Sequence, residues 1–379
     1  MSKINVRSPY LIYDNSTGIN NSPLATADLN LWIYTGNSST SMPNVDVTYT
    51  LSSAAINGEV TFEISEIVRD YIENNFDGQY DSDNVWVNWN KDLTYVNAFT
   101  GSTAQQTLAA FDGYGYFSEG TNPQNDSIVL QSNESIYTND YSRVTIPIHV
   151  KDNTTVTYFK DGEIISVKNL TASVNSADQI QYASNTSLDY DVFYSRVLAD
   201  GGDIEAFNCV KEIANEYHSD IDADTIQVSQ FGNVEVIKVK EIEECKYDPY
   251  KITFVNKYGA LQDIWFFKKS SLSMKTKQES YKANIVSAGS YSINDRQNYI
   301  FNKTGTESLK LNTGFYPEEY NEIFRQLSLS EEVWMNYENQ TLPINITSSS
   351  LNYKTRLNDK LINYTIDVEF SNDKINNIR

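Results

Sequence analysis

Apolar and polar residues alternate with a period of two over several short stretches of the first 150 residues. The alternation is clearest at residues 28–34, 45–51 and 60–64, and an apolar run follows at 85–89. Successive side chains of a strand point to opposite faces of a sheet, so this pattern predicts half-buried β-strands. A short helix is expected after Ser65, which is a favourable N-cap residue. Residues 1–150 are therefore predicted to form an N-terminal β-sandwich-like domain.

The pattern changes twice between residues 151 and 224. Asp161-Gly162 lies between the apolar runs 156–159 and 164–167, an arrangement that strongly favours a β-hairpin. Apolar residues then recur at steps of three and four from 188 to 197, and again after Asp203, a favourable N-cap. We therefore predict that residues 151–224 combine a β-hairpin with a short helical-hairpin insertion of roughly thirty residues.

Strand patterns return from residue 225 onward. The run 263–267 is apolar on both faces and is predicted to be a central, buried strand. Apolar residues at helical spacing predict a helix near 317–327. Residues 225–379 are therefore expected to form a C-terminal α+β or β-sandwich domain. The predicted fold class is mainly β with a few helices: tandem β-sandwich-like domains and the short helical-hairpin insertion.

The chain is poor in the side chains that carry out most catalysis. Its 379 residues include two histidines and two cysteines against 27 tyrosines, so general bases, nucleophiles and transition-metal ligands are scarce. His149 and His218 have no partner at ligand spacing. Asp220, Asp222 and Asp224 have the spacing that opens an EF-hand loop, but the glycine and glutamate that this loop requires are absent. We therefore expect no enzyme activity, no catalytic residue, no metal and no cofactor.

The net charge of −21 bears on the choice of partner. Electrostatic repulsion opposes docking on DNA, RNA or an anionic membrane. No apolar run approaches the length of a membrane-spanning helix, so no membrane partner is expected. Acidic residues spread over a surface favour solubility. Alternatively, they form a negatively charged surface along which DNA moves without adhering. With 50 acidic residues a pair of carboxylates at glycosidase separation can also arise, so a glycan hydrolase stays a less favoured alternative.

Aromatic residues make up 13% of the chain and are its main candidates for contact with partners. The candidate interaction residues are Trp32, Trp86, Trp89, Tyr114 and Tyr116, either as a platform on which sugars stack or as sandwich core. Trp86 and Trp89 are an odd number of positions apart, so within one strand they face opposite sides of a sheet. One of these two is therefore expected to be available for contact.

Several segments resemble virion proteins of tailed bacteriophages. Residues 5–10 and 31–36 resemble the N-terminal β-domains of such proteins. Residues 196–205, with Cys209 following, are similar to a module of structural proteins from phages that infect Bacteroidota. Two further segments, 245–268 and 358–365, resemble tail and head–tail connector proteins of the crAss-like type.

This resemblance implies a non-enzymatic structural protein, a ring component of the tail or head–tail connector that surrounds the DNA channel. The implied partners are copies of the chain in a ring of six- or twelvefold symmetry, together with other tail, portal or connector proteins. Genomic DNA is implied only as cargo that passes through the channel without adhering. The implied location is the tail or head–tail region of the virion, assembled in the host cytoplasm. A tail fibre or receptor-binding module that recognises glycans is the alternative.

Overall fold

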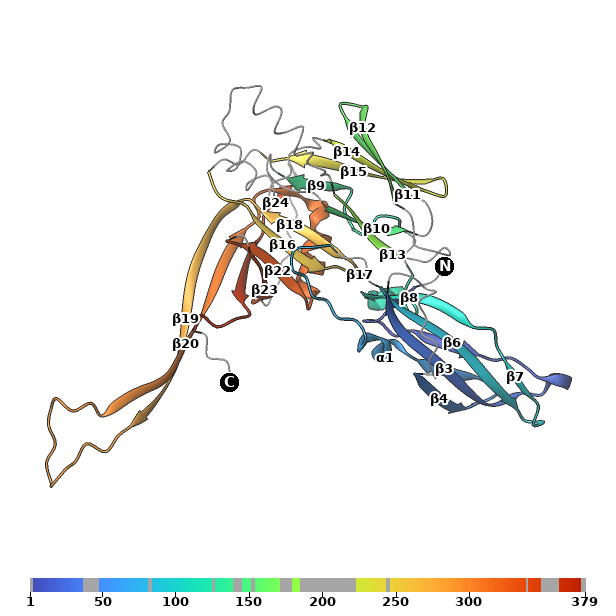
Figure 1. Cartoon of the computed structure of the whole chain (residues 1–379), viewed down its shortest axis with the longest axis horizontal. Helices are drawn as coiled ribbons and strands as arrows, with labels where there is room; N and C mark the ends of the chain where they lie inside the picture. The colour runs from blue at the N-terminus through green and yellow to red at the C-terminus, as the bar shows by residue number, and fades with distance from the viewer. Residues whose placement is uncertain are drawn as a thin grey trace. The chain divides into compact units, whose positions relative to one another are not determined.

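The computed structural model of the chain is mainly β, as the sequence predicts (Figure 1). The structure describes residues 3–36, 48–80, 84–124, 127–138, 145–150, 154–170, 179–184, 223–242, 246–338, 340–348 and 361–375. Within these ranges α4 (Asn321–Leu329) is the one helix longer than the five residues of α1 (Ser65–Arg69). The helical hairpin predicted at 188–217 lies outside the described residues.

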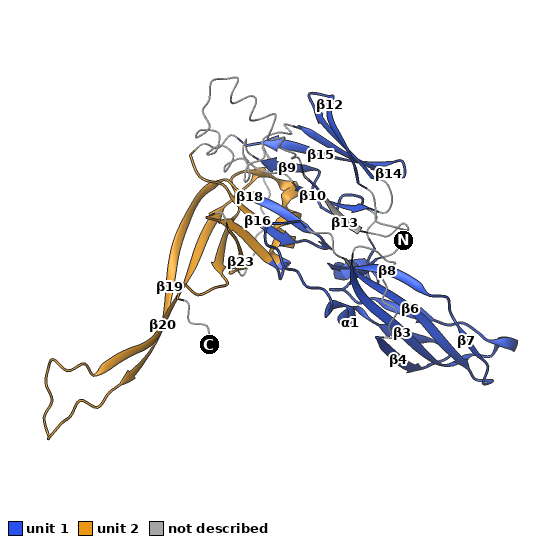
Figure 2. Ribbon diagram, in the orientation of Figure 1, with its two compact units in different colours: residues 1–243, 253–264, 329–332 blue, residues 244–252, 265–328, 333–379 orange. Residues whose placement is uncertain are grey.

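The chain divides into two compact units, and it passes between them more than once (Figure 2). Unit 1 comprises residues 1–243, 253–264 and 329–332, and unit 2 comprises residues 244–252, 265–328 and 333–379. These units gather segments that are distant in sequence. The division of the sequence at residues 150 and 224 stays a prediction.

The first sheet of unit 1 is built on two long strands. Its strand order is β1 (Ile4–Asn5), β8 (Gln106–Gly113), β6 (Asn84–Tyr95), β3 (Leu24–Gly36) and β4 (Tyr49–Ala54). Two short strands pair at its margins, β7 (Thr100–Ser102) with β6 and β17 (Tyr258–Gly259) with β8. β2 (Leu11–Asp14) and β5 (Val60–Glu63) form a separate antiparallel pair. Leu29, Leu31 and Val87 share a core with Phe62 of β5 and Val68 of α1, because alternate side chains face inward.

The predicted short helix is present, with one difference at its start. Ser65 is the first residue of α1, and Ile64 occupies the N-cap position instead. The Ser65 amide donates to Glu63 Oε1 at 2.8 Å, and the Ser65 hydroxyl bonds the same carboxylate. The Ser65 hydroxyl is thus engaged by the preceding strand rather than by the helix amides.

A second group of strands in unit 1 surrounds its own core. The five-stranded order is β12 (Glu163–Leu170), β11 (Thr154–Lys160), β14 (Thr225–Gln230), β15 (Asn233–Glu241) and β9 (Ser135–Thr138), and β10 (Thr145–Val150) pairs with β13 (Gln179–Ser184). Ile146, Ile148 and Val156 are fully buried in this core. The hairpin predicted at Asp161-Gly162 is confirmed: both residues have positive φ and connect β11 to β12.

In unit 2 five strands pair in the order β22 (Val333–Tyr337), β23 (Gln340–Ile346), β25 (Thr365–Phe370), β20 (Asn298–Asn312) and β19 (Lys268–Lys282), and β21 (Tyr316–Pro317) pairs separately with β24 (Leu361–Ile362). The predicted helix near 317–327 is confirmed as α4 and the 3₁₀ turn Glu318–Tyr320 before it. Phe324 of α4 packs on Tyr316 and Tyr364, with ring centroids 6.1 and 4.5 Å apart. The apolar face of α4 is thus buried among aromatic side chains of its own unit.

The apolar run predicted to be a central strand is buried but not central. It forms most of β18 (Leu261–Phe266), which lies at the end of its strand order beside β16 (Tyr250–Val255). Ile264, Trp265 and Phe266 are nevertheless buried. A strand with apolar side chains on both faces must be packed against other residues on both faces of the sheet. This packing does not require a hydrogen-bonded strand along each edge, so an edge strand can also be buried.

Candidate functional site

The structure buries two of the three tryptophans that the sequence nominates for contact. Trp86 and Trp89 lie on opposite faces of β6, as predicted, but both are buried, with 2% and 8% of their surface exposed. Trp89 belongs to the core with α1, whereas Trp86 packs in a second cluster with Leu130 and Ala260. The expectation that one of the pair is available for contact is therefore wrong, because later segments cover the second face. Trp32 is half-buried.

Tyr114 and Tyr116 lie together just after β8, where cationic side chains of the same unit contact them. The Arg7 guanidinium lies 5.0 Å from the Tyr114 ring centroid, and the Lys257 ammonium lies 4.8 Å from that of Tyr116. The two tyrosine rings meet edge to face at 5.8 Å. Lys257 also pairs with Glu119 at 3.1 Å. These tyrosines therefore connect three segments of unit 1 through cation–π contacts.

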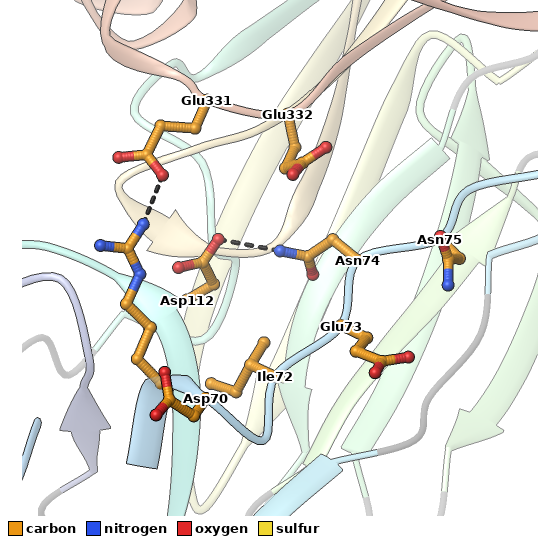
Figure 3. Close-up of a pocket in the computed structure, with 9 residues that line it drawn as sticks. Asp70, Ile72, Glu73, Asn74, Asn75, Asp112, Glu331 and Glu332 are labelled. Carbon is orange, nitrogen blue, oxygen red and sulfur yellow. Dashed lines mark hydrogen bonds and ion pairs between the residues drawn. The ribbon is translucent and has the colours of Figure 1, made fainter. Parts of the chain in front are cut away.

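Unit 1 also contains a polar pocket that the sequence analysis did not nominate (Figure 3). Its volume is about 550 Å³. The pocket is lined by Arg69, Asp70, Ile72, Glu73, Asn74, Asn75, Asp112, Glu331 and Glu332. Segments 69–75, β8 and 331–332 thus meet at one place although they are far apart in sequence. No local motif marks this site, because no single segment contributes all of its carboxylates.

The positive charges beside the pocket are directed at one carboxylate. Arg69 forms an ion pair with Glu331, and Arg7 contacts the same carboxylate at 3.2 Å. Asn74 Nδ2 donates to Asp112 Oδ2 at 2.8 Å (Figure 3). Within the described ranges no salt bridge neutralises Asp70, Glu73 or Glu332. The pocket therefore carries an excess of negative charge.

Two of the pocket carboxyls are protonated more readily than usual. Burial raises the pKa of Asp112, and the charges of Arg7 and Arg69 offset that rise only in part. Partial burial also raises the pKa of Glu332, and the negative charges of Asp112 and Glu331 add to the effect. Both shifts mean that nearby positive charges and hydrogen-bond donors do not fully offset the cost of ionising these two carboxyl groups. A cation entering the pocket would relieve that repulsion.

The most exposed feature of unit 2 is the ribbon formed by β19 and β20, here named the β-arm (Lys268–Asn312, including the connecting loop). Figure 1 shows it leaving the rest of unit 2 as a two-stranded ribbon. β25 pairs with β20 only along Ser308–Asn312, so no third strand from the described residues pairs with the distal part of the arm. Exposed apolar side chains are frequent along the arm: Leu272, Met274, Tyr281, Ile293, Ile300 and Phe301.

Stacked aromatic side chains stiffen the distal part of the β-arm. Tyr281 and Tyr299 are cross-strand partners whose rings stack at 5.4 Å with an interplanar angle of 12°. Phe301 approaches Tyr281 at 5.8 Å. At about 3.4 Å per residue, strands of this length reach roughly 50 Å. The distal part of the β-arm thus presents a long surface with both faces exposed.

No protein-family model matches the chain, and no curated protein sequence matches it significantly. In the part of the chain that the structure describes, no helix has the length and apolar character needed to cross a membrane. In that same part, no group of three or more His, Cys, Asp or Glu side chains is arranged to hold a metal ion.

Proposed function

We propose that this chain is a non-enzymatic structural component of a phage virion, which assembles with its own copies into a ring of the tail or head–tail connector. The β-arm is the observation that carries the proposal. Two-stranded ribbons are only marginally stable alone in water, and exposed apolar side chains along them favour burial in an interface. An arm of this length suits attachment to a neighbouring subunit.

Ring formation requires a heterologous interface that closes by rotation. An arm on one side of each copy and a different receiving surface on the other side would meet that requirement. Six or twelve copies would surround the DNA channel, beside other tail, portal or connector proteins. The net charge of −21 supports a channel through which DNA passes without adhering.

The proposal is tested by shortening the β-arm at a point that preserves the sheet. Lys275 and Thr306 are cross-strand partners, so residues 276–305 can be replaced by Asn-Gly, which favours a tight hairpin turn. Pairing of Ser308–Asn312 with β25 is retained. We expect the wild-type chain to form closed rings by electron microscopy and sedimentation velocity. The shortened chain should stay monomeric with an unchanged thermal unfolding midpoint.

Virion composition provides the second half of the test. Mass spectrometry of purified virions should detect the chain at a copy number that matches a ring. A chain that is monomeric at high concentration and absent from virions would contradict the proposal.

A glycan hydrolase is the second candidate function, and the pocket is the observation that favours it. A carboxyl group with a raised pKa beside a second carboxylate is what a general acid requires. Asp112 and Glu332 are the pair with that property. Hydrolysis of a broad panel of glycans, lost in Asp112→Asn and Glu332→Gln, would support this candidate, and no turnover by the wild-type chain would exclude it.

A further inference from the structure

We infer that the acidic pocket of one copy receives basic side chains from the β-arm of a neighbouring copy. This inference rests on the proposed function and names the two surfaces that join adjacent subunits. The pocket lies entirely within unit 1 and the β-arm entirely within unit 2. The contact would therefore give each subunit a donor surface and a different acceptor surface, as a closed ring needs.

The distribution of charge is the first argument. The β-arm contains seven lysines and one arginine against two glutamates and one aspartate, a net charge of +5. The rest of the chain then carries 21 basic and 47 acidic residues, a net charge of −26. Opposite charge on two surfaces of one chain steers copies together and fixes their register. A second copy is thus the occupant that the charge pattern favours.

The second argument is that the distal lysines of the β-arm are available for such a contact. Near the base of the arm, Lys275 and Lys310 pair with Glu369 and Asp367, each at 3.6 Å. Farther out, Lys277, Lys282 and Lys303 are exposed, and no acidic partner lies within ion-pair distance among the described residues. These three lysines flank the stack of Tyr281 and Tyr299.

The pocket supplies the complementary half of the contact. Asp70, Glu73 and Glu332 line it without a cationic partner among the residues that the structure describes. Its volume of about 550 Å³ is large enough to admit a lysine side chain. An ammonium group would pair with carboxylate oxygens that have no cationic partner in the pocket. Burial is the main cause of the raised pKa values of Asp112 and Glu332, and repulsion from neighbouring carboxylates adds to it.

The alternative occupants are less well supported. A metal ion would need a cluster of ligands, and none is present in the described part of the chain. Nucleic acid would be attracted by the β-arm but repelled by the −26 charge on the rest of the chain. DNA binding by the β-arm is therefore treated as an outcome that would overturn the inference.

Charge reversal provides the test. One variant reverses the arm, Lys277→Glu with Lys282→Glu, and the other reverses the pocket, Glu73→Lys with Glu332→Lys. Each variant alone should raise the concentration needed for assembly by roughly a hundredfold, since like charges would then face each other. An equimolar mixture should assemble again, because each reversed surface meets an opposite charge on the other variant.

The mixed ring has a distinctive composition. It must contain alternating copies of the two variants, so native mass spectrometry should find an even-numbered ring with equal amounts of each. Lys238→Glu with Lys240→Glu on β15 is the matched control for the arm variant. It also replaces two lysines with glutamates, but outside the β-arm. This control should assemble like the wild-type chain.

Three outcomes would overturn the inference, and they differ from failure of the proposed function. Normal rings from the pocket variant, with none from the shortened arm, would mean that the arm docks elsewhere while the ring proposal stands. Failure of the mixture to assemble would exclude contact between these two surfaces. Loss of duplex-DNA binding in the arm variant, by fluorescence anisotropy, would assign the arm to nucleic acid. If the wild-type chain forms no ring and is absent from virions, the proposed function itself fails.

Discussion

Asn256 shows how one buried side chain connects several segments of unit 1. It is fully buried, and its amide nitrogen donates to the Leu130 carbonyl at 2.7 Å and to Gln262 Oε1 at 3.0 Å. Its amide oxygen accepts from the backbone amides of Tyr258 and Ala260 at 2.9 and 3.2 Å. All four hydrogen-bonding positions of the side chain are thus used. The turn that carries β17 depends on this arrangement.

Replacing Asn256 with alanine should therefore be costly. The change removes four hydrogen bonds and leaves buried backbone groups unpaired, which lowers the free energy of unfolding by about 2–4 kcal/mol. Urea denaturation monitored by tryptophan fluorescence measures this change. Asn298→Ala, at an exposed position of the β-arm, is the control and should alter stability by less than about 0.5 kcal/mol. Equal effects of the two substitutions would contradict the role of Asn256.

Asp112 gives a prediction about pH at the same scale. Because burial raises its pKa, the folded state binds this proton more readily than the unfolded state. The contribution of Asp112 to stability is therefore most favourable below its unfolded pKa, and it decreases as pH rises through the raised folded pKa. Asp112→Asn removes this penalty and retains an oxygen that can accept from Asn74.

The variant should be more stable than the wild-type chain at pH 7, and this gain should vanish at pH 3. Chemical denaturation of both proteins at the two pH values measures the difference. A loss of stability of equal size at both pH values would show instead that Asp112 matters only for packing.

At the scale of elements, unit 1 depends on a close approach of two backbones. β17 pairs with β8 through Tyr258 and Gly113 and through Gly259 and Asp112. A Cβ atom on Gly259 would lie 2.7 Å from the Asp112 amide nitrogen, and Gly259 has a φ of +77°. The position thus requires glycine for two reasons, its left-handed backbone and the contact with β8. This pairing holds Asp112 at the pocket.

Gly259→Ala and Gly120→Ala separate the two reasons. Gly120 has a similar φ of +74°, but a Cβ atom there would meet nothing within 4 Å. Alanine at Gly120 should cost only the backbone strain, about 1–2 kcal/mol. Alanine at Gly259 should cost roughly 1–3 kcal/mol more, because β17 must move away from β8. Thermal unfolding of the two variants measures the difference, and equal midpoints would mean that the β17–β8 contact yields without cost.

At the scale of the whole molecule, the separation of charge between the β-arm and the rest of the chain is the dominant feature. Opposite charges on two surfaces attract over about 10 Å at 0.1 M salt and less at higher salt. The β-arm also has exposed apolar side chains, which salt does not weaken. Self-association through the β-arm should therefore combine a salt-sensitive contribution with a salt-resistant one.

Assembly should accordingly weaken as ionic strength rises. Sedimentation velocity in 0.05 M and 0.5 M sodium chloride should show a shift from rings toward smaller species for the wild-type chain and for the equimolar mixture of the two charge-reversal variants. Neither variant alone should show this shift, because like charges face each other in it and salt screens repulsion as well as attraction. Exposed ion pairs lose most of their attraction over this range. Assembly that strengthens with salt would show that apolar contacts dominate the interface.

Much of the secondary structure could be predicted from the sequence because it depends on local periodicity. The strands at residues 28–34, 60–64 and 85–89, the Asp161-Gly162 hairpin and the helix near 317–327 follow from spacing and turn chemistry alone. The β-arm could not be predicted in this way. Its distal strands are exposed on both faces, so no apolar stripe distinguishes them from loops.

Residue pattern and composition alone establish that this protein is mainly β, that residues 264–267 are buried and that the chain carries a large negative charge. These properties depend on neighbouring residues or on simple sums over the chain. The packing of distant segments, in contrast, covers Trp86 and brings Asp112 and Glu332 into one pocket. Ala260, which packs in the same cluster as Trp86, and Glu332, which lines the same pocket as Asp112, are each more than a hundred residues away along the chain. Local spacing contains no information about which distant segments pack together.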